Sequence, residues 1–244
     1  PTGVGALNVH GQTIHSFFGF KPDITLKKAR ELGYAARSDN NKRSKLYKEL
    51  KTIVIDEVSM VRADLLDCVD EFLRASRKKK DLPFGGAQMI MIGDLYQLPP
   101  VVTSAEKYSF AQQYPTSYFF SANALKNFPM EYIELEKIYR QSDAAFIRIL
   151  NAIRNNTVDE DLLAKLNQQV RENFNPPKDK LHITLTPTNA AAQTINQARL
   201  RELKGEAWKY RGHISGTFDE KQVPADQELL VKPGAQVMMA ANDR

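Results

Sequence analysis

Cysteine is nearly missing from this chain of 244 residues: Cys68 is the only one, so no internal disulfide can form. It lies in a run with helical spacing, which predicts a small core residue. No apolar run is long enough to cross a bilayer, and the first residues lack the basic-then-apolar pattern of a secretory signal. Internal repeats and low-complexity tracts are also missing. We therefore expect an intracellular globular protein without membrane contact, cytoplasmic if the source is bacterial.

The composition is that of an ordinary globular protein, with 42% hydrophobic and 26% charged residues. A chain of this length can bury one sizeable core or two modest ones. The net charge of +5 fits a polyanionic partner better than an acidic balance would. The densest basic run, residues 77–80, ends a predicted helix, where cations suit the helix dipole and stay solvated. The charge alone therefore proves little about function.

Three short apolar runs, residues 53–55, 89–92 and 182–185, each stop at polar or acidic residues. This pattern predicts buried parallel strands. Amphipathic helical spacing separates them, which indicates an α/β protein whose ligands bind beyond the carboxyl ends of the strands. The predicted helices cover residues 63–75, 144–155, 159–173 and 190–203.

A domain boundary is expected near Phe128-Pro129, because a new strand-like run at 132–135 and a fresh series of helices follow it. We predict two sheet-centred domains, residues 1–128 and 129–244. The polar and basic segment at about 17–50 predicts a small helical or irregular insertion in the first. The chain begins in a turn and ends on a strand-like run at 236–240, so we expect further protein on both sides.

The clearest chemical pattern is the apolar run that ends in Asp56 and Glu57. Such a strand brings one carboxylate to hold Mg²⁺, directly or through water, and a second to orient and deprotonate a water that attacks a phosphate. This is a Walker B pattern. An acidic pair after a strand also occurs as a solvated turn or a helix start, so the pattern is only moderately specific by itself.

A second strand end carries Gly-Asp-Leu-Tyr-Gln-Leu-Pro-Pro-Val at residues 93–101. The amide of Gln97 can reach a terminal phosphate, and the two prolines stiffen the loop. A proline-rich turn would explain the prolines alone. It would not explain the whole string.

Together, Asp-Glu-Val-Ser-Met at residues 56–60 and residues 93–101 resemble the second and third motifs of the Pif-one/RecD-like superfamily-one helicases. Further matches follow in the family's order: single-strand-binding motifs at 1–4 and 11–18, a fourth motif at 139–141, a second-domain DNA contact at 186–189, and the strand before the fifth motif at 231–239.

The resemblance implies two RecA-like parallel-sheet domains, both incomplete, and a monomeric motor that uses ATP and Mg²⁺ on single-stranded DNA and at single-strand/double-strand junctions. It implies 5′-to-3′ movement in DNA repair, recombination or replication. The implied catalytic residues are Asp56, Glu57, Gln97 and Arg140, with Asp56 on Mg²⁺ through the nucleotide. The implied DNA-binding residues are Thr2, Gly3, Thr13, His15, Phe17, Pro99, Pro187, Thr188 and Asn196.

Several of these residues have an ordinary structural reading as well. A ring such as Phe17 is more often core than a stacking platform for bases, and a lone histidine such as His15 is usually structural. Arg140 after a strand can simply pair with a surface carboxylate. None of the four histidines lies near a Cys or carboxylate cluster with metal-ligand spacing, so a zinc site is not expected.

The family's phosphate-binding loop requires a Gly-Lys pair, which this chain does not contain. We therefore expect the helicase activity of the intact parent protein and little ATP hydrolysis by this piece alone. Two other interpretations stay open: a RecD-like subunit for recombination or transfer, and a non-catalytic module that binds single strands. A magnesium-dependent nuclease is weaker, because it would leave Gln97 unexplained.

Overall fold

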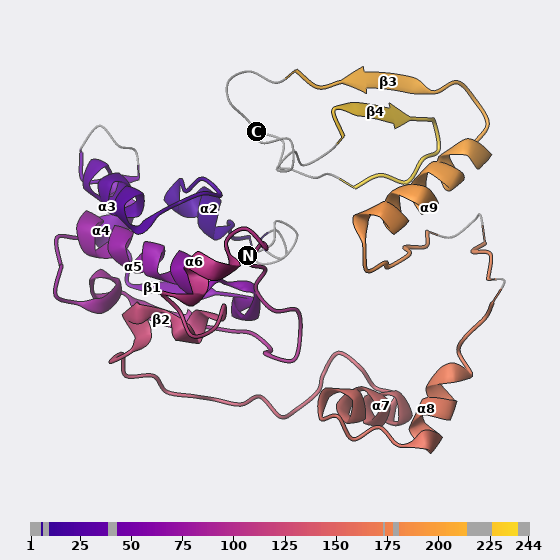
Figure 1. Ribbon diagram of the computed structural model, residues 1–244, viewed down its shortest axis with the longest axis horizontal. Helices are drawn as coiled ribbons and strands as arrows, with labels where there is room; N and C mark the ends of the chain where they lie inside the picture. Colours follow the sequence, from indigo (N-terminus) through magenta and orange to yellow (C-terminus); the bar gives the residue numbers. More distant parts are fainter. Residues whose placement is uncertain are drawn as a thin grey trace. The chain divides into compact units, whose positions relative to one another are not determined.

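A computed structural model describes residues 6, 10–38, 43–172, 174–177, 181–213 and 226–238. Its internal contacts divide the chain into two compact units, Pro1–Thr157 and Val158–Arg244 (Figure 1). This division falls after the predicted boundary at 128–129, which stays a prediction. No helix within the described residues is long and apolar enough to span a membrane.

The first unit is built on a parallel pair of strands, β1 (Thr52–Ile55) and β2 (Gln88–Met91). Ile53 lies opposite Met89, and Ile55 lies opposite Met91. Helix α5 (Ala63–Ser76) connects them, as a parallel pair requires a crossover. The two strands and the helix begin and end within one residue of the sequence prediction. The α/β class with a parallel sheet is confirmed.

Helix α5 forms the centre of the core. Leu66, Val69 and Leu73 recur at helical spacing and are fully buried. Asp64 in the first turn and Arg74 in the last turn suit the helix dipole. Cys68 is buried in the same core, as predicted, and burial raises the pKa of its thiol to about 12. That thiol therefore stays protonated and inert near neutral pH.

Three helices cover α5 from the segment that precedes β1: α2 (Ile14–Phe18), α3 (Leu26–Ala35) and α4 (Ser44–Glu49). Phe18 and Tyr47 meet Phe72 of α5 with ring centroids 5.1 and 4.9 Å apart. Gly33 lets α3 approach α5 closely, since a Cβ at this position would lie 2.6 Å from the Phe72 carbonyl oxygen. Residues 17–50, predicted to be a small helical or irregular insertion, contain the end of α2 together with α3 and α4 among the described residues. Its status as an insertion stays a prediction.

The first unit continues through the short helix α6 (Lys107–Ala111) to α7 (Ala144–Arg154), whose N-cap Asp143 accepts a hydrogen bond from Phe146 N. Four short 3-10 helices occur among the described residues of this unit: η1 (Val58–Met60), η2 (Pro83–Gly86), η3 (Phe119–Ser121) and η4 (Asn123–Leu125). The strand predicted at 132–135 is wrong, since this segment has no ladder partner among the described residues. Its apolar side chains are exposed, so the burial that would stabilise a strand is missing.

The second unit contains α8 (Glu160–Asn167), α9 (Asn189–Glu202) and an antiparallel pair, β3 (Trp208–Arg211) and β4 (Glu228–Val231). The strand predicted at 182–185 is also wrong, because this segment has no ladder partner among the described residues either. Residues 236–238 are not in a strand, and the end of that predicted run lies outside the described residues. A second parallel sheet therefore stays a prediction.

Candidate functional site

Asp56 and Glu57 leave the end of β1 in a constrained turn. The Asp56 Oδ1 atom accepts a hydrogen bond from Glu57 N at 2.9 Å. Glu57 has a φ of 53° and a ψ of 43°, the left-handed region that residues other than glycine rarely adopt. Such strain is concentrated at functional sites, where surrounding contacts hold it in place. Here the next residue, Val58, donates its N–H to Ile92 O at 2.9 Å.

The end of β2 lies directly against this turn. A Cβ at Gly93 would lie 3.0 Å from both Val58 N and Val58 Cγ1, so glycine permits the close approach. The loop that begins at Gly93 and the turn at 56–58 are therefore neighbours. The carboxyl ends of both parallel strands bring polar side chains to one edge of the sheet.

Asp94 organises the loop after β2. Its Oδ1 atom accepts a hydrogen bond from Tyr96 N at 3.0 Å, and its Oδ2 atom accepts one from Gln97 Nε2 at 3.2 Å. Arg154, the last residue of α7, donates to the same Oδ2 atom at 2.8 Å. The Asp94 side chain is only 20% exposed, whereas Gln97 is exposed. Asp94 thus holds the loop in place, while the Gln97 side chain is exposed to solvent.

Of the four predicted catalytic residues, the structure places three on these adjoining turns: Asp56, Glu57 and Gln97. Arg140 lies in the exposed segment before α7 and has no hydrogen-bond or ion-pair partner among the described residues. A magnesium ion on a nucleotide needs one or two carboxylates beside the phosphates. The half-buried Asp56 at the strand end fits that requirement. The described residues hold no group of three or more His, Cys, Asp or Glu that could bind a metal by themselves.

Three of the predicted DNA-binding residues of the first unit lie at or on α2: Thr13, His15 and Phe17. The Thr13 side chain caps this helix by accepting a hydrogen bond from Ser16 N at 3.2 Å. Burial lowers the pKa of the half-buried His15, so its imidazole is neutral near pH 7. The Phe17 ring contacts Phe18 edge to face, with centroids 4.8 Å apart, and packs on the core. Thr2 and Gly3 lie outside the described residues.

Pro99 follows the Asp94 turn and is exposed. Its neighbours Leu98 and Val101 are 69% and 76% exposed, which leaves an apolar tip on this loop. An exposed apolar tip beside a polar strand end is typical of a ligand contact rather than of core packing.

In the second unit, Pro187, Thr188 and Asn196 lie at or on α9. Thr188 caps the helix, since its side chain accepts a hydrogen bond from Ala191 N at 3.3 Å. Pro187, Thr188 and Asn196 are all exposed. The start of a helix offers unpaired backbone N–H groups to phosphates, as the sequence prediction for these residues supposed.

The sequence did not indicate that Arg154 contacts the loop after β2, or that its guanidinium lies near the Tyr96 ring. The Arg154 guanidinium carbon lies 5.9 Å from the Tyr96 ring centroid, in addition to its ion pair with Asp94. A basic residue in the last turn of a helix looks like an ordinary dipole partner. No local pattern in the sequence indicates that it contacts a residue 60 positions earlier.

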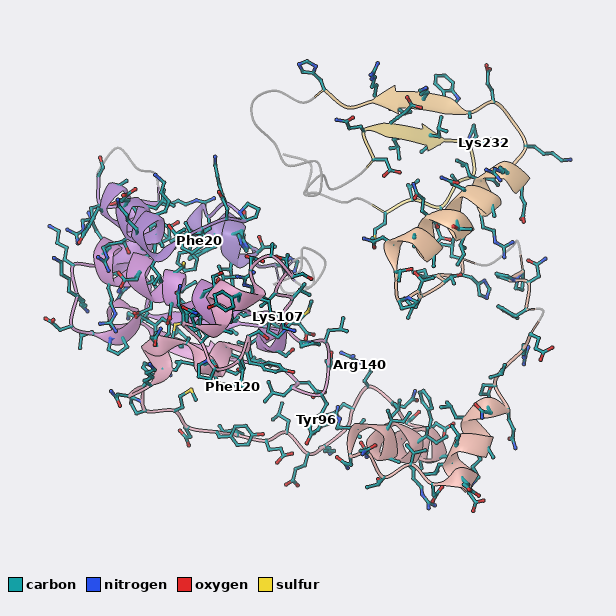
Figure 2. All side chains as sticks on the ribbon, viewed as in Figure 1. Phe20, Tyr96, Lys107, Phe120, Arg140 and Lys232 are labelled. Atoms are coloured by element: carbon teal, nitrogen blue, oxygen red, sulfur yellow. The ribbon has the colours of Figure 1, made fainter. Side chains whose placement is uncertain are left out.

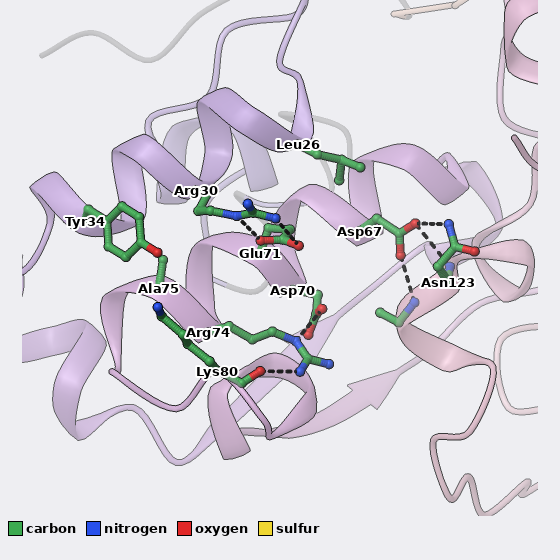
Figure 3. A pocket seen from close by; sticks show the side chains of 11 residues that line it. Leu26, Arg30, Tyr34, Asp67, Asp70, Glu71, Arg74, Ala75, Lys80 and Asn123 are labelled. Carbon is green, nitrogen blue, oxygen red and sulfur yellow. Dashed lines mark hydrogen bonds and ion pairs between the residues drawn. The ribbon is translucent and has the colours of Figure 1, made fainter.

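A separate polar pocket lies between α3, α5 and the turn at 123–124 (Figure 3). Its charged groups bind one another: Arg30 forms a two-pronged ion pair with Glu71, and Arg74 bonds both Asp70 and the Lys80 carbonyl oxygen. Burial raises the pKa of the Asp70 carboxyl, although the Arg74 bond opposes the shift. These side chains satisfy each other, so the pocket stabilises the unit and is not part of the candidate site.

The fold belongs to the α/β class in which ligands bind beyond the carboxyl ends of parallel strands, and the polar side chains described above lie at those ends. A model of the PIF1-like helicase family matches residues 1–162. This chain belongs to the PIF1-like helicase family.

Several named proteins resemble the chain over nearly all of its length. The ATP-dependent DNA helicase PIF1 of Saccharomyces cerevisiae is 31% identical over 255 aligned residues, which take in 99% of this chain and 28% of that protein. The Xenopus laevis helicase of the same name is 32% identical, over 99% of this chain and 36% of that protein. The Saccharomyces cerevisiae helicase RRM3 is 30% identical, over 99% and 32%.

Solved structures of Pif1 helicases also resemble this chain over most of its length. The crystal structure of a Pif1 helicase from Bacteroides in complex with ADP-AlF3 and ssDNA superposes with a TM-score of 0.79 and 32% identity, and the match covers 95% of this chain and 52% of that one. The Pif1 helicase from Candida albicans gives a TM-score of 0.75 and 28% identity, covering 95% and 51%. The chain therefore spans about half the length of the solved relatives and about a third of the curated ones.

Proposed function

We propose that the parent protein of this chain is an ATP-dependent DNA helicase that moves along single-stranded DNA. The observation that carries the proposal is the pairing of the two strand ends: Asp56 and Glu57 adjoin the loop of Asp94 and Gln97 through the Val58–Ile92 hydrogen bond and the approach at Gly93. The relatives support it, because they are named ATP-dependent DNA helicases and one was solved with ADP-AlF3 and ssDNA.

Each residue has a role in hydrolysis. Asp56 holds Mg²⁺ on the nucleotide, and Glu57 orients the attacking water and takes its proton. Gln97 donates its amide N–H to the terminal phosphate, and Arg140 neutralises the charge that develops there. When bound, Mg²⁺–ATP supplies the phosphate to be transferred. Because Arg140 lies outside the sheet edge that carries the other three, its approach makes hydrolysis depend on conformation.

DNA binding in this proposal uses two surfaces. Thr13, His15, Phe17 and Pro99 contact the strand from the first unit, together with Thr2 and Gly3. Pro187, Thr188 and Asn196 contact it from the second. Hydroxyl groups and backbone amides at helix starts bind phosphates, while His15 stacks on a base in its neutral form. We propose 5′-to-3′ movement by an intracellular monomer, with single strands and single-strand/double-strand junctions as substrates, in DNA repair, recombination or replication.

We further propose that residues 1–244 alone hydrolyse ATP far more slowly than the parent protein. The sequence contains no Gly-Lys pair, and the lysine of that pair normally contacts the β- and γ-phosphates. Activity is therefore tested on the parent protein.

The test is ATP hydrolysis by the parent protein, with and without single-stranded DNA, for the unaltered protein and for Glu57→Gln. We expect DNA to stimulate hydrolysis and Glu57→Gln to lower the stimulated rate by about 10² to 10⁴, the usual contribution of a general base. Glu131→Gln is the matched control, because Glu131 is exposed and has no partner among the described residues. Absence of hydrolysis in the unaltered parent would favour a module that only binds single strands.

A further inference from the structure

The loop at 94–97 is anchored from outside its own strand. Its anchor is Arg154, which reaches Asp94 Oδ2 at 2.8 Å from the far end of α7. The same oxygen accepts the hydrogen bond from Gln97 Nε2 at 3.2 Å. One carboxylate oxygen thus serves both the side chain with a proposed role at the phosphate and a guanidinium 60 residues away. Figure 2 marks Tyr96, which Arg154 also approaches.

The Arg154–Asp94 ion pair differs from a typical surface ion pair in the burial and the hydrogen bonds of its carboxylate. Exposed pairs contribute little to stability, and the Arg154 side chain is 51% exposed. Asp94, however, is only 20% exposed, and it also accepts the N–H of Tyr96. With its oxygens occupied in this way, the carboxylate has little freedom to turn. The orientation of the Gln97 amide therefore depends on a contact with α7.

The alternative reading is that Arg154 merely complements the dipole at the end of α7. Any exposed cation in the last turn would do that, and the dipole does not direct its guanidinium toward Asp94. Arg148 provides the comparison within the same helix. It is exposed and has no hydrogen-bond or ion-pair partner in the described part of the chain.

We propose that Arg154 is a positioning residue that fixes the Gln97 amide through Asp94 and so ties the loop at 94–97 to helix α7. This inference rests on the proposed function. Helix α7 begins at Ala144, four residues after Arg140, and its 11 residues form a rod of about 16 Å. The segment that carries Arg140 therefore leads into one end of this helix, and the contact that orients Gln97 is made from the other end. A shift of α7 would therefore move the anchor of Gln97 and the point at which the Arg140 segment enters the helix.

The experiment measures DNA-stimulated ATP hydrolysis by the parent protein and compares Arg154→Ala with Arg148→Ala. We expect Arg154→Ala to lower kcat roughly five- to tenfold, because a misoriented amide weakens an interaction made in the transition state. The KM for ATP and the Kd for single-stranded DNA should change less than about twofold, since neither depends chiefly on this amide. Arg148→Ala should behave as the unaltered protein.

A double-variant cycle decides whether Arg154 acts through Gln97. If it does, Arg154→Ala should cause no further loss of kcat in a Gln97→Ala background. Multiplying losses would overturn the inference, as would an Arg154→Ala protein with the kcat of Arg148→Ala. Equal falls in kcat and in folded fraction, followed by thermal melting, would show a merely structural role and also overturn it. Absence of DNA-stimulated hydrolysis in the unaltered parent would instead refute the proposed function, and this inference with it.

Discussion

Carboxylates at the two strand ends accept hydrogen bonds from their own turns. Asp56 accepts the N–H of Glu57, and Asp94 accepts that of Tyr96, while Arg154 also holds Asp94 from 60 residues away. Such short-range bonds restrict rotamers without adding much stability. Gln97 and Arg140 are exposed to solvent, and they are the two residues whose side chains are proposed to contact a phosphate.

Replacement of Arg140 by alanine should separate hydrolysis from DNA binding. Arg140 has no hydrogen-bond or ion-pair partner among the described residues, so its removal breaks no such contact there. An arginine that neutralises a transition-state phosphate contributes about 10³ to 10⁵ in kcat in GTPases. We expect a loss of this order in the parent protein, with single-strand affinity nearly intact by fluorescence anisotropy. Equal losses of both would rule out this role.

A second residue-scale prediction concerns Ser59, whose hydroxyl is completely buried and has no hydrogen-bond partner in the described structure. An unsatisfied buried polar group costs about 1–3 kcal/mol, so Ser59→Ala should raise the free energy of unfolding by about 1 kcal/mol. Urea denaturation measures the change. Tyr114→Phe is the opposite control: it removes a buried hydroxyl that donates to Asp67 at 2.9 Å, and it should destabilise the protein. A destabilised Ser59→Ala protein would contradict the prediction.

At the scale of elements, the packing of α3 on α5 depends on Gly33. A Cβ there would lie 2.6 Å from the Phe72 carbonyl oxygen and 2.7 Å from Ala75 Cβ, so the helices must move apart to accept one. Gly33→Ala should therefore lower the free energy of unfolding by about 1–3 kcal/mol, although alanine is the better helix former. Thermal melting tests this, with Glu31→Ala on the exposed side of α3 as the control. A higher melting temperature for Gly33→Ala would refute the close contact.

The elements that the sequence predicted well have local signals. Helices α5 and α7 follow from apolar periodicity, and strands β1 and β2 follow from short apolar runs within their own residues. Helix α9 was also predicted, although none of its residues is buried. The family followed from the order of motifs along the chain, and the comparisons confirm it.

The elements that the sequence predicted poorly depend on distant partners. The runs at 132–135 and 182–185 have strand composition but no ladder partner among the described residues, and composition alone cannot supply one. Strands β3 and β4 were not predicted. Each has only four residues and no buried face; β4 lacks alternation, and the alternation of Trp208-Lys209-Tyr210-Arg211 in β3 was not recognised. The Arg154–Asp94 contact was missed for a similar reason, since nothing near either residue indicates the other.

For the whole molecule, the basic net charge of +5 leads to a prediction about DNA affinity. Binding that neutralises phosphates releases counterions, with a slope of about −0.7 per phosphate for single strands. We expect the affinity of the parent protein for single-stranded DNA to fall roughly tenfold to a hundredfold between about 50 and 200 mM salt. A strand analogue with an uncharged backbone is the control. A flat salt response with natural DNA would contradict the proposed phosphate contacts.

The left-handed backbone at Glu57 has a practical consequence for trapping the nucleotide-bound form of the proposed helicase. Residues with a branched Cβ resist positive φ strongly, whereas asparagine and glycine adopt it more readily. Glutamine has nearly the shape of glutamate and a similar conformational cost at positive φ. Glu57→Gln therefore removes only the carboxylate that is proposed to take the proton. Valine or isoleucine at this position would also disturb the turn that joins β1 to the β2 loop. The loss of activity in such a protein would come from a disturbed turn and not from a missing base.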